Sequence, residues 1–126
     1  SQPAEVALSF LKNIQGIGEL VLLNVVSTGE TDEEIEANVA IATKKTEEIA
    51  GELNKGGMKV TPKVVIGHPV EMIRTVADEE DVSLIAMSSQ GAVAIKKGRI
   101  GSTAYDVANS ADKPVLILRR SKIAMY

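Results

Sequence analysis

The segment Val82–Leu118, with the sequence VSLIAMSSQGAVAIKKGRIGSTAYDVANSADKPVLIL, decides the fold. It opens with an apolar run at 82–87, passes through a connection with glycines and basic residues, and ends in the run VLIL at 115–118. Apolar residues recur at helical spacing between Gly101 and the last run. Two short apolar runs joined by a helix are typical of parallel strands buried on both faces. The segment therefore predicts an α/β fold with a parallel sheet.

The rest of the chain repeats this alternation. Strands are predicted at 19–26 and 59–67, and helices at 3–14, from Thr31 to a stop at Gly56-Gly57, and from Pro69 onward. Thr31, followed three residues later by Glu34, forms a capping-box pattern. Pro62 has no backbone N–H, so it should lie at a strand start or on an edge strand. The order predicts a three-layer α/β/α open parallel sheet, formed as one domain of residues 1–126.

The composition excludes several kinds of site. The chain has no cysteine and one histidine, which removes disulfides, thiolate metal sites and multi-histidine metal sites. The lack of cysteine fits a cytoplasmic protein. No apolar run reaches the roughly 18 residues that a membrane span needs. The net charge of −3 argues against nucleic acid as a partner.

The connection Ser88–Thr103 is a candidate anion site. It leaves the carboxyl end of a predicted strand, which is where ligands bind in open parallel α/β sheets. Its glycines allow a backbone to approach a ligand closely, and Gly101–Thr103 should start a helix, whose free N–H groups attract phosphate. Lys96, Lys97 and Arg99 add positive charge. The alternative is that Ser102 is only a helix cap and the glycines only shape a turn.

The spacing in this connection is similar to that of a known family. Ser88-x2-Gly91-x9-Gly101-Ser102, followed by Lys113-Pro114-Val115, resembles the Gly-x2-Gly-x9-Gly-Ser/Thr signature and Pro-Val strand of the universal stress protein domain. The resemblance covers essentially the whole chain. It implies a parallel sheet with strand order 3-2-1-4-5.

The resemblance also implies a ligand and a partner. In the ATP-binding branch of the family, the glycine loop holds the ribose and phosphates. By position, Ser88 and Gly91 would lie at the ribose and phosphates, and Gly101, Ser102 and Thr103 would hold the phosphates. Val25 matches the position whose backbone meets adenine. The expected cofactor is ATP or AMP, with magnesium as an accompanying ion, and the expected assembly is a homodimer through the last strand, Val115 to Leu118.

The chain departs from the family pattern in two places. Ser88 replaces the first glycine of the signature, where a side chain would crowd the ribose or hydrogen-bond to it. The family's first strand, which ends in an adenine-reading aspartate, has no counterpart in the sequence. Its loss would leave a gap between family strands 2 and 4. We therefore expect that the chain is part of a longer polypeptide or that the first strand comes from elsewhere.

The residues favour binding over catalysis. No nucleophile with an adjacent base, acid–base pair or metal cluster stands out, so no catalytic or metal-binding residue is assigned. His68 reads as a turn residue and Asp106 as a solvated helix residue. The leading interpretation is a dimeric, nucleotide-binding stress-response module that hydrolyses ATP slowly at most. The alternatives are a nucleotide-free dimeric interaction scaffold of the same family and, less favoured, a small flavodoxin-like enzyme.

Overall fold

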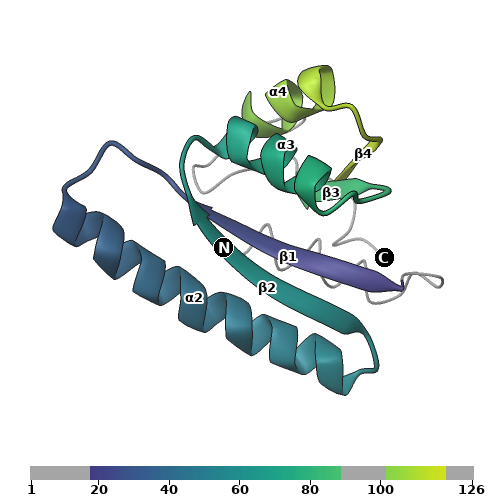
Figure 1. Ribbon diagram of the computed structural model, residues 1–126, viewed down its shortest axis with the longest axis horizontal. Helices are drawn as coiled ribbons and strands as arrows, with labels where there is room; N and C mark the ends of the chain where they lie inside the picture. The colour runs from purple at the N-terminus through teal and green to yellow at the C-terminus, as the bar shows by residue number, and fades with distance from the viewer. Residues whose placement is uncertain (1–17, 89–101, 119–126) are drawn as a thin grey trace. The chain divides into compact units, whose positions relative to one another are not determined.

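Helices and parallel strands alternate along the chain, as the sequence predicts. The computed structural model describes residues 18–88 and 102–118. In chain order its elements are β1 (Glu19–Val26), α2 (Asp32–Lys55), β2 (Lys59–Ile66), α3 (Pro69–Glu79), β3 (Ile85–Ser88), α4 (Ser102–Ser110) and β4 (Val115–Leu118) (Figure 1). The helix predicted at 3–14 lies outside the described residues.

The described strands form two parallel pairs. β1 pairs with β2, and β3 pairs with β4. In the family numbering these are strands 2 with 3 and 4 with 5. Among the described residues no ladder joins the two pairs.

The chain divides into two compact units, Gln15–Val76 and Ser1–Ile14 with Ala77–Tyr126. The single domain expected over residues 1–126 stays a prediction.

Helix α2 packs against both strands of the β1–β2 pair, along which it runs in Figure 1. Its start is the predicted cap, because the Thr31 side chain accepts a hydrogen bond from the Glu34 backbone N–H at 3.2 Å. It ends at Gly56, as predicted, and Gly57 has a φ of 96°, which favours glycine. Buried positions recur along one face, at Ala42, Thr46, Ala50 and Leu53. Local capping and this apolar face together explain why the helix forms here.

The outer edge of β2 lacks two of its free N–H donors. Gly67, just beyond β2, donates its N–H to the carbonyl of Val26 at 3.0 Å, so odd-numbered residues of β2 face β1. Even-numbered residues therefore face the outer edge. There the Val60 N–H is taken by Oδ1 of Asn54 at 3.0 Å, and Pro62 has no N–H to offer. The prediction that Pro62 marks an edge strand is confirmed.

Strand β3 begins later than the sequence predicts. The run at 82–87 was expected to be strand throughout, but β3 spans Ile85–Ser88. The reason is that the turn that closes α3 extends into the start of this run. The Val82 N–H returns to the carbonyl of Ala77 at 3.1 Å, and Asp81 has a φ of 47°. Leu84 is left exposed, and regular pairing starts only at Ile85, whose N–H donates to the carbonyl of Pro114 at 2.9 Å.

Helix α4 is anchored by two buried residues. Ala104 and Val107 have relative exposures of 2% and 0%, as the predicted apolar stripe requires. Ala108, also placed in that stripe, is exposed, and Ala111 lies beyond the helix end. The buried pair fixes which face of α4 is turned inward, and it leaves Ser102 exposed at the helix start.

Candidate functional site

The six predicted ligand residues fall into three groups. Val25 lies near the carboxyl end of β1, in the unit Gln15–Val76. Ser88 is the last residue of β3, and Ser102 and Thr103 are the first two residues of α4. Gly91 and Gly101 lie outside the described residues. The described residues of the predicted site thus belong to two units, Val25 to one and Ser88, Ser102 and Thr103 to the other.

The backbone of Val25 faces the edge of β1 that has no described partner. Because the Val26 carbonyl accepts the Gly67 N–H, Val26 faces β2. In a β-strand the N–H and C=O of one residue point to one edge, and those of the next residue point to the other. Val25 therefore directs its N–H and C=O away from β2. These are the groups that a backbone-reading ligand site requires at this position.

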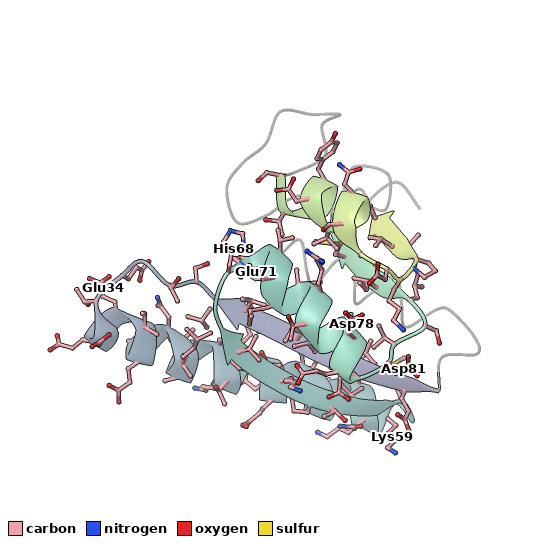
Figure 2. All side chains as sticks on the ribbon, turned by 45° about the horizontal axis from the view of Figure 1, so that its top comes forward. Glu34, Lys59, His68, Glu71, Asp78 and Asp81 are labelled. Atoms are coloured by element: carbon pink, nitrogen blue, oxygen red, sulfur yellow. The ribbon has the colours of Figure 1, made fainter. Side chains whose placement is uncertain are left out.

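The turn after β2 packs tightly beside this strand end. Lys59 and His68 lie at opposite ends of β2, and His68 stands next to Glu71 at the start of α3 (Figure 2). A Cβ built on Gly67 would lie 2.7 Å from Cγ and 2.9 Å from Sδ of Met72. The sequence predicts only that Gly67 ends the strand at 59–67. The signal that could have found this contact is the Gly-x-Pro pattern directly after a buried strand.

Ser88 has the same edge geometry as Val25. The Ile85 N–H donates to Pro114, so Ile85 and Met87 face β4. By alternation, the backbone N–H and C=O of Ser88 point to the edge of β3 away from β4. The residue that replaces the first signature glycine thus ends its strand with its backbone groups turned to an edge without a described strand partner.

The start of α4 is suited to an anion. The first N–H groups of a helix have no partner within the helix, and the helix dipole places partial positive charge there. Ser102 is exposed and Thr103 is half-buried, and each brings a hydroxyl to this turn. No acidic residue lies in the first turn of α4. The described part of the predicted phosphate cradle therefore has donors and no opposing charge.

An ion pair holds the other end of the β3–β4 pair. Nζ of Lys113 lies 2.9 Å from Oδ1 of Asp81, which joins the segment before β3 to the segment before β4. The hydrogen bond from Lys113, together with its charge, holds the pKa of Asp81 below its ordinary value. The same hydrogen bond raises the pKa of Lys113, and Asp81, Asp78 and Asp112 add attraction. This contact supports the sheet at the end away from Ser88.

The described residues hold no arrangement typical of catalysis by a metal. No group of three or more potential histidine, cysteine or carboxylate ligands lies together among them. His68 and Asp106 are both exposed, and the Asp106 carbonyl accepts the Ser110 hydroxyl at 2.6 Å. In the same parts of the chain, no helix is both long and apolar enough to cross a bilayer.

Comparison with known proteins shows clear similarities. A family model described as the universal stress protein family matches residues 1–119. The chain is 30% identical to Universal stress protein MJ0577 of Methanocaldococcus jannaschii, over 95% of this chain and 90% of the relative. The solved structure of protein MJ0577 matches with a TM-score of 0.81 at 32% identity, and covers 95% of this chain and 90% of that chain.

Two further solved structures share the fold. The universal stress protein UspA from Lactobacillus plantarum has a TM-score of 0.84 at 21% identity, with 94% of this chain and 91% of that chain covered. A universal stress protein solved in complex with cAMP has a TM-score of 0.55 at 17% identity, with 83% of this chain and 98% of that chain covered. At such identities these likenesses show the α/β fold alone.

Proposed function

Because the chain belongs to the universal stress protein family, we propose that it is a regulatory protein that binds ATP or AMP at the carboxyl ends of its strands. The observation that carries the proposal is the start of α4, where Ser102 and Thr103 open a helix without an acidic first turn. Gly91 and Gly101 complete the phosphate cradle by the spacing of the signature. A relative of the same fold solved with cAMP supports an adenine nucleotide as ligand.

The backbone of Val25 supports a preference for adenine. A strand residue with a free C=O and N–H can accept from the adenine 6-amino group and donate to the neighbouring ring nitrogen. Guanine has an acceptor oxygen in place of the amino group and an N–H donor in place of the ring nitrogen, so its donors and acceptors are reversed. We therefore assign base recognition to Val25 and phosphate binding to the start of α4.

The protein would act by binding. The described residues hold no nucleophile with an adjacent base, so any hydrolysis of ATP would be slow, with magnesium only accompanying the phosphates. We propose a homodimer through β4, because Val115 and Ile117 direct their backbone groups away from β3 by the same alternation. Occupancy of the nucleotide site would then alter the dimer surface of a cytoplasmic stress-response module.

The test is direct identification of the nucleotide. Purified protein is denatured, and released nucleotide is identified by absorbance and mass. Calorimetry then compares ATP, AMP, adenosine and GTP on the protein freed of ligand. Binding of ATP with weaker binding of adenosine and GTP is expected. Protein that releases nothing and binds none of the four contradicts the proposal.

A nucleotide-free interaction scaffold is the second candidate, and Ser88 favours it. A serine at the first signature position places a side chain where the family pattern has none. Replacement of Ser88 by glycine separates the two functions. If serine blocks the ribose, Ser88→Gly should convert a protein that does not bind ATP into one that does. If serine is tolerated, both forms bind.

A further inference from the structure

The ends of β1 and β2 are joined by one well-defined hydrogen bond. The register pairs Val25 with Val65 and Val26 with Ile66, and the next residue, Gly67, donates its N–H to Val26 at 3.0 Å. This bond is the last one between the two strands at the carboxyl end. It anchors the carboxyl end of a ladder in which Val26 faces β2 and Val25 faces the other edge.

The position of Gly67 depends on close contact with Met72. An added Cβ would lie 2.7 Å from Cγ of Met72, a middle atom of that side chain, and 3.4 Å from its terminal Cε. The φ of Gly67 is 159°, which side chains rarely adopt, so both the backbone conformation and Met72 oppose a side chain here. Met72 is itself held in the first turn of α3, where its N–H donates to the His68 carbonyl at 2.9 Å.

We propose that Gly67 and Met72 are positioning residues that hold the Val25 backbone in the orientation that reads the adenine ring. The inference rests on the proposed function and adds a determinant of base selectivity to it. Met72 packs on the bare backbone of Gly67, Gly67 binds the Val26 carbonyl, and the end of the ladder beside Val25 is thereby held in place. A side chain at 67 forces either Met72 or the strand end to move.

The test measures selectivity between bases, since a loss of stability alone would weaken all nucleotides alike. Dissociation constants for ATP and GTP are measured for wild type, Gly67→Ala, Met72→Ala and the double variant. Gly67→Ala should raise the dissociation constant for ATP about tenfold, which corresponds to the loss of roughly one hydrogen bond. The dissociation constant for GTP should stay nearly unchanged. The double variant should recover part of the ATP-to-GTP preference that Gly67→Ala loses, because the smaller side chain at 72 makes room for the added methyl group.

Two further variants keep the test decisive. Gly51→Ala is the matched control, because a Cβ there meets nothing within 4 Å, and its preference should equal that of wild type. If Gly67→Ala does not fold, Met72→Phe presses on the same backbone from the other side and should lower the preference. Equal losses for ATP and GTP, an unchanged preference, or a double variant without recovery overturns the inference. A wild type that binds no adenine nucleotide overturns the proposed function as well.

Discussion

Helices α2 and α4 begin in opposite ways. At the start of α2 the Thr31 side chain caps a free N–H, and the first turn carries Asp32, Glu33 and Glu34. The start of α4 has Ser102 and Thr103 and no acid in its first turn. Acids at a helix start offset the dipole and would repel an anionic ligand. The contrast fits the proposal that α4 keeps its first turn open for a phosphate, whereas the start of α2 is capped for stability.

The largest effect is expected when the start of α4 is made to resemble that of α2. Ser102→Glu adds a negative charge to an exposed residue of the first turn. It should lower the affinity for ATP roughly 30-fold, about 2 kcal/mol, because the added charge repels the phosphates. The same change should raise the free energy of unfolding by about 0.5 kcal/mol, because an acid at this end complements the dipole. Calorimetry and urea unfolding measure the two opposite effects.

Asn109→Glu is the control for this change. Asn109 is also exposed on α4, but it lies in the last turn. The variant carries the same added charge and should bind ATP like wild type. A Ser102→Glu protein that binds ATP as tightly as the Asn109→Glu protein would show that the start of α4 does not hold the phosphates.

The converse change removes the cap of α2. Thr31→Ala leaves the Glu34 N–H without its side-chain acceptor and should lower the free energy of unfolding by about 1 kcal/mol. ATP affinity should not change, because this helix start serves only the fold. Thr31→Ser, which retains the hydroxyl, should restore stability in the same urea titration. A marked loss of ATP affinity in Thr31→Ala would contradict the division of roles between the two helices.

Elements with local signals were predicted well. The strand at 19–26 is β1, the Thr31 cap starts α2, Gly56 ends it, and Pro69 is the first residue of α3. Each of these depends on chemistry within a few residues. Examples are a hydroxyl near a free N–H, and a proline at the first helical position, where a backbone N–H would have no partner in the helix. The α/β fold followed from their order, and the likeness to solved structures confirms it.

Features set by the exact course of the backbone between elements were not predicted. The apolar run at 82–87 does not reveal that the Val82 N–H closes α3 on Ala77, which delays β3. The resemblance pointed to Val25, but the edge that its backbone faces follows from the hydrogen bond between Gly67 and Val26. The contact of Gly67 with Met72 depends on how α3 folds back, and the Gly-x-Pro pattern marks the turn without naming its contact partner.

The smallest effect is expected at the ion pair between Asp81 and Lys113, which lies at the end of β3–β4 away from Ser88. Asp81→Asn removes the charge and keeps a residue that tolerates the left-handed backbone at this position, where φ is 47°. The lowered pKa of Asp81 means that its contribution is present above the unfolded value near 4 and is lost as pH falls through the folded pKa. The raised pKa of Lys113 means that its contribution is lost only as pH rises through a value above about 10.4.

Stability measured between pH 2 and pH 7 checks this prediction. Wild type should lose slightly more stability than Asp81→Asn as the pH falls below about 4, because only wild type has the Asp81 carboxylate to protonate. Lys113→Met should show the same weaker pH dependence as Asp81→Asn, since replacing either residue removes the ion pair. ATP affinity at pH 7 should be equal in all three proteins. A parallel pH dependence in wild type and Asp81→Asn would mean that the ion pair contributes nothing in solution, as many exposed pairs do.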